Sequence, residues 1–289
     1  MTVTFANRCS DIIGLLSMKI PFLFKNNITT LINMKNNNLL YIVNKDNYTK
    51  EDISTLYDRA IKFDSIALSG CTLNFQGKNN ILIITGNTKF NTSKIVFKGD
   101  NSIVIIGDSQ LTNTFIGIHH NSNVFIGHKT AFNAGGATKR IIVGEGQSVI
   151  IGNECLFSVN LWIRNTSGHP IYDFNGNRLD QPGGGVFIGD HVWFGETASI
   201  LGPATVASGS IIGANSFVHN KIIKSNSLWA GEPCKHIVDN RCWIKESTVT
   251  YSATDIDNSR HKEVDSVIFN NSPDSISSTQ IDNLSLIHI

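Results

Sequence analysis

An apolar or aromatic side chain recurs at every sixth position through one stretch of this chain. The six positions are Ile188, Phe194, Ile200, Val206, Ile212 and Val218. A helix repeats its apolar face about every 3.6 residues and a strand every two, so neither explains this period. A chain that turns a corner every six residues, with one inward side chain per face, does explain it. Small residues follow four of these positions, where a corner leaves little room: Gly189, Gly195, Ala207 and Gly213.

A longer repeat precedes the six-residue one. Four similar β-rich runs, NNILIITG, DNSIVIIG, NSNVFIG and GQSVIIG, end at Gly86, Gly107, Gly127 and Gly152, with spacings of 21, 20 and 25 residues. Gly, Asn and Asp separate the runs and supply turn conformations that β-branched residues resist. A repeat of about twenty residues is typical of a solenoid, in which each coil buries its apolar face by stacking on the next. We therefore expect an all-β solenoid.

The composition fits a protein with a buried core. Of the 289 residues, 41% are hydrophobic and 16% are charged, which is too little charge for a wholly disordered chain. The 24 Lys and Arg against 23 Asp and Glu leave a formal net charge of +1. That balance argues against a protein that coats a polyanion, so we expect no nucleic-acid partner.

The apolar stretch at residues 12–24 does not predict a membrane span. Lys19 and Pro21 interrupt it, and it falls short of the ~20 residues that a span requires. Its basic flank is a single Arg8 and no small-residue cleavage site follows, so we interpret it as a packing element. The five cysteines form an odd set without a CxxC pair, which indicates free thiols in a reducing cytoplasm. They are Cys9, Cys71, Cys155, Cys234 and Cys242.

Three segments are expected along the chain. Residues 1–62 form a mixed α/β segment with one helix over residues 50–62, and residues 63–245 form the solenoid domain. Residues 246–289 are rich in Ser, Asn and Asp and lack periodicity, which predicts a poorly ordered tail. The last six residues, LSLIHI at 284–289, resemble the translated end of a library adaptor and are left out of the fold prediction.

The repeats resemble a known family, the left-handed parallel β-helix acyltransferases, in which three hexapeptides make one triangular coil. The resemblance covers residues 66–240 and is most specific over residues 162–237, where GHPIYD, IGDHVWFG and LWAGEPCKHI stand in the family's order. It points to sugar O-acetyltransferases of the galactoside and maltose type and of the capsular polysialic acid type; residues 163–179 favour the capsular branch. The family implies a protruding catalytic loop, acetyl-CoA as donor, and a homotrimer with sites between subunits.

His169 lies in a Gly-, Asn- and Pro-rich interval that interrupts the repeat between Asn165 and Gly185. A long loop in a regular solenoid is a frequent place for function. Acyl transfer to an alcohol needs a general base, and imidazole titrates near neutral pH. From the residues alone, an exposed surface histidine is the more frequent interpretation. The resemblance implies that His169 is the catalytic base.

Trp193 lies 24 residues beyond His169, the spacing found in the sugar O-acetyltransferases. The six-residue register places it outward, beside the inward Phe194, where a partner or a ligand should cover it. A subunit-interface role is compatible with that placement. The family implies that this Trp contacts the thioester end of acetyl-CoA, near the histidine of a neighbouring subunit.

The family also implies direct transfer, in which the sugar oxygen attacks the thioester and the backbone N–H of Glu196 stabilises the oxyanion. The capsular enzymes carry an Asp two residues before the histidine, where this chain has Ser167. The group that orients the imidazole therefore stays open between a backbone carbonyl and another carboxylate such as Asp173.

Other site residues follow from the resemblance or from proximity. Ala214 is expected to line the pantetheine arm of CoA and Lys235 to bind the nucleotide end, with Lys221 and Lys224 as further cations that could equally be solvated. The acceptor candidates lie near His169: Arg164, Asn165 and Tyr172.

No carbonic-anhydrase-like spacing appears among the remaining histidines, so we expect no metal. These histidines are His119, His120, His128, His191 and His219. Cys155 and Cys234 occupy small or inward positions, which indicates buried packing. The sequence thus predicts a cytoplasmic, acetyl-CoA-dependent O-acetyltransferase for a capsular or surface polysaccharide such as a sialic acid polymer. A small acceptor (a simple glycoside, an amino sugar or an antibiotic) and a non-catalytic scaffold are the alternatives, although a scaffold needs neither His169 nor Trp193.

Overall fold

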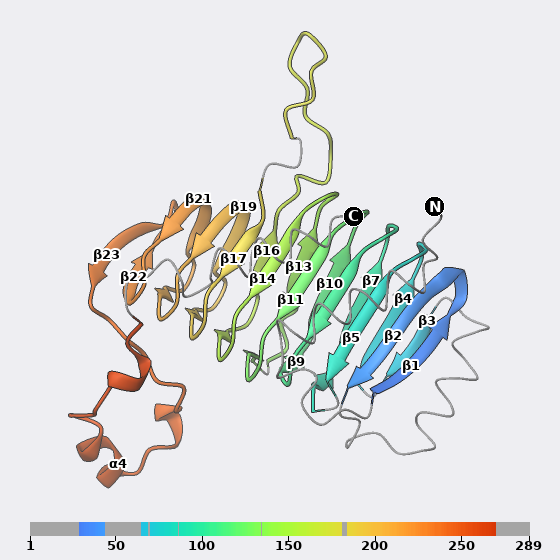
Figure 1. Cartoon of the computed structure of the whole chain (residues 1–289). Helices are drawn as coiled ribbons and strands as arrows, with labels where there is room; N and C mark the ends of the chain where they lie inside the picture. Colours follow the sequence, from blue (N-terminus) through green and yellow to red (C-terminus); the bar gives the residue numbers. More distant parts are fainter. Residues whose placement is uncertain are drawn as a thin grey trace.

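A computed structural model describes residues 29–43, 65–68, 70–85, 87–133, 135–180 and 184–269. Short parallel strands stack coil upon coil into a solenoid of about 7 turns (Figure 1). The solenoid prediction is thereby confirmed. The expected helix at residues 50–62, the packing element at residues 12–24, Cys9 and the chain beyond residue 269 lie outside the described residues.

The strands form three faces, and the chain visits each face once per coil. The first face contains β4 (Cys71–Phe75), β7 (Ser93–Phe97), β10 (Thr114–Ile118), β13 (Lys139–Val143), β16 (Trp162–Arg164) and the first halves of β19 (Ser199–Val206) and β21 (Phe217–Ile223). The second contains β2 (Asn38–Val43), β5 (Ile81–Thr85), β8 (Ile103–Ile106), β11 (Asn123–Ile126), β14 (Ser148–Ile151), β17 (Val186–Ile188) and the second halves of β19 and β21. The third contains β6 (Lys89–Asn91), β9 (Gln110–Thr112), β12 (Ala131–Phe132), β15 (Leu156–Phe157), β18 (Trp193–Phe194), β20 (Ile211–Ile212) and β22 (Ser227–Ala230).

Antiparallel strands pair with the outermost coils. β1 (Thr29–Met34) pairs with β2, β3 (Ser65–Leu68) with β4, and β23 (Lys235–Asp239) with β22. The helical elements are short: η1 (Lys35–Asn37), η2 (Thr248–Thr250), α4 (Ala253–Asn258) and η3 (Asp265–Val267). β1 and β2 fall in the expected N-terminal segment yet extend the second face, and α4 falls in the expected tail. The segment boundaries themselves stay predictions.

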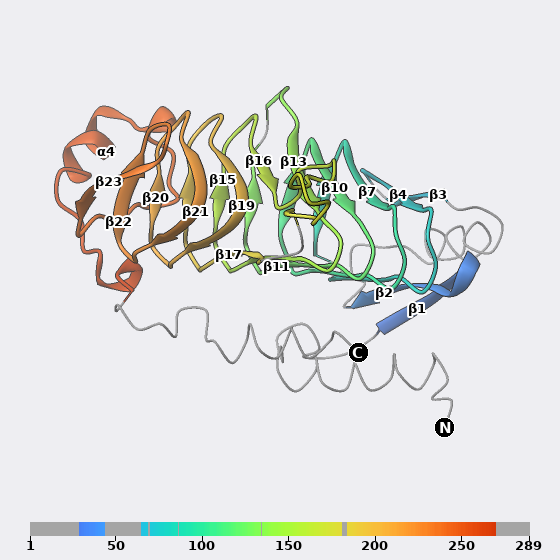
Figure 2. The same cartoon turned by 90° about the horizontal axis from the view of Figure 1, so that it is seen from above.

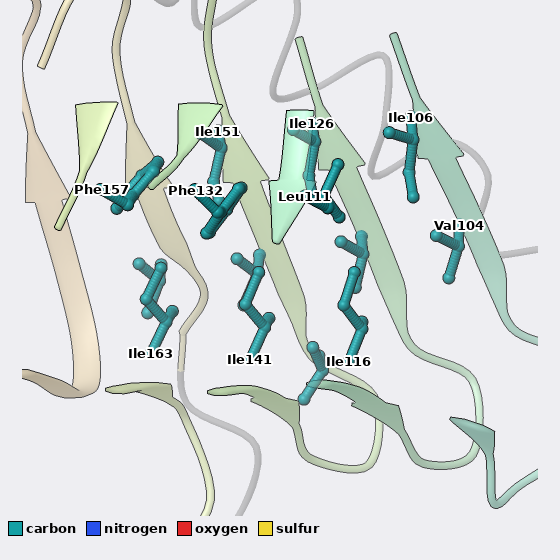
Figure 3. Packing of buried hydrophobic residues seen from close by; sticks show 14 of the residues in the cluster. Val104, Ile106, Leu111, Ile116, Ile126, Phe132, Ile141, Ile151, Phe157 and Ile163 are labelled. Carbon is teal, nitrogen blue, oxygen red and sulfur yellow. The ribbon is translucent and has the colours of Figure 1, made fainter. Parts of the chain in front are cut away.

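Inward side chains of successive coils stack directly on one another. All six residues predicted to point inward, from Ile188 to Val218, are fully buried, which confirms the six-residue register. Figure 3 shows such columns from each face, two of them aliphatic and one that contains Phe132 and Phe157. The rings of Phe132, Phe157 and Phe194 are stacked, with centroids 4.6 Å and 5.1 Å apart. Each such burial contributes about 1.5–3 kcal/mol, so strands of only two residues are held by their columns.

The corners between faces use backbone conformations with positive φ. Asn79, Asn101 and Asn121 fill one corner on successive coils with φ of 57°, 58° and 54°. Asn tolerates this left-handed region better than most residues. Their amides also bond in series, because Asn79 Nδ2 donates to Asn101 Oδ1 at 3.2 Å and Asn101 Nδ2 donates to Asn121 Oδ1 at 3.3 Å. The Asn between the β-rich runs therefore builds corners rather than loose loops.

The interval predicted between Asn165 and Gly185 projects from the solenoid as a long loop (Figure 1). It leaves at the end of β16 and returns at β17, which places its root at the corner between the first and second faces. Figure 2 shows the same loop end-on, from above. Across the described part of the chain, every helix is too short or too polar to cross a membrane.

Candidate active site

A tight turn forms the outer end of the loop that carries His169. Asp173 organises it, because its carboxylate accepts the backbone N–H groups of Asn175 at 2.9 Å and Asn177 at 2.8 Å. The side-chain amide of Asn177 donates to the other carboxylate oxygen at 2.9 Å. This side-chain bond, with the backbone bonds, lowers the pKa of Asp173. Both carboxylate oxygens of Asp173 are therefore engaged within the turn.

A second carboxylate, Asp180, fastens the root of this hairpin. It pairs with Arg178 at 2.8 Å and accepts the backbone N–H of Ile171 at 3.0 Å. The Ser167 hydroxyl lies 3.2 Å from Asp180 Oδ2 and 2.6 Å from the carbonyl oxygen of His169. The Arg178 hydrogen bond, followed by the Ile171 N–H, holds the pKa of Asp180 well below its usual range. Asp180 thus ties together the chain on both sides of His169.

His169 itself is exposed, and its imidazole makes no hydrogen bond with any residue that the structure describes. Arg164 binds the main chain just before His169. Its Nε donates to Thr166 O at 2.5 Å, and its Nη2 donates to Ser167 O at 2.7 Å. Gly168 has a φ of +79°, and a Cβ there would overlap the Arg164 guanidinium. The loop therefore fixes the backbone of His169 while leaving the ring open.

The three acceptor candidates take different places. Arg164 is committed to the loop root by the two bonds above. Asn165 is buried; its Oδ1 accepts from Gly144 N at 2.8 Å, and its Nδ2 donates to Ser148 O at 3.2 Å. Tyr172, in contrast, is 57% exposed on the hairpin. Arg164 and Asn165 thus hold the loop on the solenoid, and Tyr172 presents its side chain outward.

Trp193 lies on the third face, outward and 37% exposed, as the register predicts. Its neighbours on the adjacent coils are Leu156 and Ile211. The loop of His169 leaves the opposite corner of the same triangular coil. The described residues show no contact between His169 and Trp193, so one chain keeps the two predicted site residues apart.

Glu196 and Ala214 lie together at the corner that follows the third face. Asn215 N donates to Glu196 O at 2.8 Å, and a Cβ added to Gly195 would lie 2.5 Å from Ala214 N, so the two coils approach closely. The backbone N–H of Glu196 has no acceptor within the described ranges. Lys235 is exposed next to this corner, since it pairs with Ala230 of the following coil. These three candidates lie along one edge of the solenoid.

The other two lysines lie away from that edge. Lys221 pairs with Ala204 at the corner from which the loop projects, two coils further on. Its charge opposes the effect of burial on Cys234, and burial dominates, raising the pKa of that thiol to about 11. Lys224 is exposed at the start of the next turn. Within one chain, Lys221 and Lys224 thus lie at other corners of the solenoid than Glu196 and Ala214.

Two of the cysteines outside the loop pack in the core. Cys155 and Cys234 are fully buried free thiols, as predicted, and burial raises the pKa of Cys155 to about 12. Burial also lowers the pKa of His119 and His128. Among the residues with a described position, no three His, Cys, Asp or Glu gather into a group that could hold a metal ion. The expectation of a metal-free site stays a prediction.

Sequence reasoning missed Asp180. The Asp173 turn is marked by a local Asp-x-Asn-Gly-Asn run, whereas no such run marks Asp180. Besides Arg178, its partners lie 9 and 13 residues earlier in the chain, at Ile171 and Ser167. The pairing of Tyr172 with Arg178 across the hairpin brings them together.

Comparison with known proteins gives one consistent group of relatives. A polysialic acid O-acetyltransferase of Neisseria meningitidis is 33% identical over 147 residues, which are 50% of this chain and 66% of that protein. The crystal structure of the polySia-specific acetyltransferase NeuO is similar with a TM-score of 0.56 and 30% identity, over 65% of this chain and 86% of that one. The polysialic acid O-acetyltransferase OatWY follows with a TM-score of 0.55 and 25% identity, over 68% and 93%. No protein-family model matches the chain.

We expect Asp180→Asn to loosen the hairpin, because the ion pair with Arg178 is lost and the bond to Ile171 weakens. Trypsin should then cut after Arg178 severalfold faster than in the native protein. The pKa of Asp180 is lowered by folding, so its contribution is complete above the unfolded value of about 4 and is lost only below it. Native hairpin stability should accordingly stay constant between about pH 5 and pH 8.

The control for this prediction is Asp239→Asn. Asp239 pairs with His236 at 2.9 Å, far from the loop in the chain, and its loss should leave cleavage after Arg178 unchanged. Equal cleavage rates in the native protein and Asp180→Asn would show that Asp180 does not hold the hairpin.

Proposed function

Because the chain belongs to the family of hexapeptide-repeat acyltransferases that includes the polysialic acid O-acetyltransferases, we propose that it transfers an acetyl group from acetyl-CoA to a sugar hydroxyl. One observation carries this proposal: His169 stands exposed and unpaired among the described residues, on a loop whose backbone is clamped on both sides. A scaffold needs a regular surface and no clamped loop. A base must instead be held in place with its ring free to meet a substrate.

In the proposed mechanism His169 removes the proton of the acceptor hydroxyl. The oxygen attacks the thioester carbonyl, a tetrahedral oxyanion forms, and the CoA thiolate leaves as the carbonyl reforms. The backbone N–H of Glu196 suits the oxyanion because it has no acceptor within the described ranges. A single donor of this kind contributes about 3 kcal/mol to transition-state stabilisation. Ala214 and Lys235 continue along the same edge, where the pantetheine arm and the nucleotide would lie.

A second copy of the chain would complete the site. Four apolar side chains are more than half exposed on the projecting hairpin: Ile171, Tyr172, Phe174 and Leu179. Apolar side chains gathered on an arm require a surface that covers them. The third face of another copy offers Leu156, Trp193 and Ile211 on successive coils. A homotrimer, which the family resemblance implies, would bring His169 of one copy to Trp193 of the next.

The first face supports an acidic polysaccharide as the acceptor. Cations and rings alternate there on successive coils, in the order Lys94, Phe115, Arg140 and Trp162. The Arg140 guanidinium lies 5.1 Å from the centroid of the Trp162 ring. The Phe115 ring lies next to Gly117, where an added Cβ would be 2.9 Å from the ring.

The charge of this face suits carboxylated sugars. Its strands contain no Asp or Glu within their described bounds. Lys94 and Arg140 lie two coils apart along the solenoid, and neighbouring coils are about 4.8 Å apart. Guanidinium groups bind carboxylates through paired hydrogen bonds, and aromatic faces provide flat apolar contact. The row ends at β16, from which the loop of His169 departs, so a sialic acid polymer along this face would reach the base.

The first test is transfer itself. We expect His169→Ala to reduce acetyl transfer by about 10²- to 10⁴-fold, the usual contribution of a general base, while CoA binding persists. The measurement is thiol release from acetyl-CoA with polysialic acid, other capsular polysaccharides, galactosides or amino sugars. His261→Ala, an exposed histidine outside the loop, should match the native protein. Turnover only on small sugars would favour the small-acceptor alternative, and neither turnover nor CoA binding would favour a scaffold.

The shared site is tested by complementation. His169→Ala and Trp193→Ala should each be inactive alone, whereas co-expressed copies carrying different tags should recover part of the activity. Recovery is expected because mixed oligomers contain sites in which an intact His169 faces an intact Trp193. Purification over the two tags in succession establishes that the two variants assemble together. A mixed oligomer without recovered activity would mean that both residues act within one chain.

The acceptor row is tested by charge reversal. We expect Arg140→Glu to raise the KM for the polymer about tenfold, which corresponds to about 1.4 kcal/mol, and to leave the KM for acetyl-CoA unchanged. Lys89→Glu is the control, because Lys89 is exposed on the third face. An unchanged polymer KM would remove the row from acceptor binding. A changed oligomeric state would instead make the first face a subunit contact.

A further inference from the structure

The chain beyond β23 returns along the corner between the second and third faces. Residues 241–245, which we call the C-terminal strap, contact three coils along that corner. Arg241 N donates to Asn226 O at 2.8 Å, Trp243 packs on His191, and Lys245 Nζ bonds to the carbonyl oxygen of Lys129. The strap thereby reaches the coil that carries the candidate active-site strand β18.

Trp243 and His191 form a closed pair in the strap. Their rings are stacked with centroids 4.2 Å apart and planes 15° apart, and both side chains are buried. Trp243 Nε1 donates to the carbonyl oxygen of His191 at 2.8 Å. His191 Nε2 lies 2.9 Å from the carbonyl oxygen of Trp243, and because a carbonyl only accepts, this nitrogen carries the hydrogen. Two reciprocal bonds and a stack fix Trp243 in one orientation.

The backbone position of His191 accepts several residue types. It has a φ of 52°, and four different residues fill the same corner at positive φ on the neighbouring coils: Lys129, Glu154, Gly209 and Asn226. Gly and Asn adopt positive φ with little cost, and they would satisfy this corner as well. The corner itself therefore does not call for an imidazole. What the ring adds is the contact with Trp243.

The pair lies against Trp193. The Trp193 and Trp243 rings have centroids 6.0 Å apart and planes at 42°, a tilted aromatic contact. Trp193 sits on a two-residue strand and is 37% exposed, so its own strand gives the indole little lateral support. No other aromatic ring contacts Trp193 within the part of the chain that the structure describes. Trp243 consequently covers one side of the Trp193 indole.

Phe269 closes the far side of the same cluster. Its ring centroid lies 6.1 Å from that of His191, and its backbone N–H donates to Asn226 Oδ1 at 3.0 Å. A Cβ added to Gly209 would lie 2.8 Å from the Phe269 ring, so glycine makes room for it. The segment after residue 245 thus returns to the strap, where Phe269 contacts the His191 ring next to Trp243.

We propose that Trp243 is a positioning residue, which holds the indole of Trp193 in the orientation that meets the thioester end of the acyl donor. The inference rests on the proposed function, which places Trp193 at the donor. Trp243 acts through Trp193, and the stacked ring of His191 holds Trp243 in place. A strap that merely anchored the chain end would stabilise the fold without changing affinity for CoA.

The test compares donor affinity with fold stability. We expect Trp243→Ala to weaken CoA binding about tenfold, the effect of losing a buried aromatic contact of this kind, with an unchanged KM for the acceptor. Trp243→Phe keeps the stacked ring and should restore most of the affinity. His191→Asn keeps a residue suited to positive φ and removes the ring, so it should behave like Trp243→Ala. Arg241→Ala, exposed on the same strap, is the control and should bind CoA normally.

A double-variant cycle separates positioning from direct contact. In a Trp193→Ala background, Trp243→Ala should cause no further loss of CoA affinity, because its effect passes through the indole. An equal loss in both backgrounds would overturn the inference, as would a lower Tm with unchanged CoA affinity. A native protein that binds no CoA would overturn the proposed function and this inference together. If the native protein binds CoA and Trp243→Ala leaves that affinity unchanged, this inference alone is overturned.

Discussion

Each coil of this solenoid takes its backbone hydrogen bonds from the coils on either side of it. Gly127 N donates to Ile151 O at 2.9 Å, and Gly152 N donates to Ile188 O at 2.8 Å, one coil further along. No coil can therefore form alone, and every inward side chain must match the one above and below it. The regular six-residue pattern follows from this dependence, since a single extra residue on a face would break the ladder on both sides.

The same dependence decides where a long loop can be placed. Extra residues are tolerated only at a corner, where the chain lies outside the ladder. The loop of His169 begins at such a corner, and the strands on either side keep their register as though it were absent. Ile163 pairs with Ile200, and Ile188 pairs with Val206, across the coil that carries the loop. The loop can therefore project far while both of its roots stay fixed on the solenoid.

The sequence predicts the features that depend on residues close together in the chain and misses those that depend on residues far apart in it. The inward residues, the outward Trp193 and the root of the loop follow a local period, and the structure places them as that period predicts. Asp180 and Trp243 could not be found in this way. Asp180 meets Ser167 only because the hairpin closes, and Trp243 meets His191 across 52 positions of sequence because the chain reverses along a corner. No local pattern encodes either return.

Ser167, two residues before His169, links the two sides of the loop. Its hydroxyl reaches both the His169 carbonyl and Asp180, so a carboxylate from the chain that follows the histidine lies beside it. Asp180 is held in turn by Arg178, the cross-hairpin partner of Tyr172. The backbone of His169 and the exposed ring of Tyr172 consequently belong to one hydrogen-bonded unit, and the hairpin must be closed for His169 to be held.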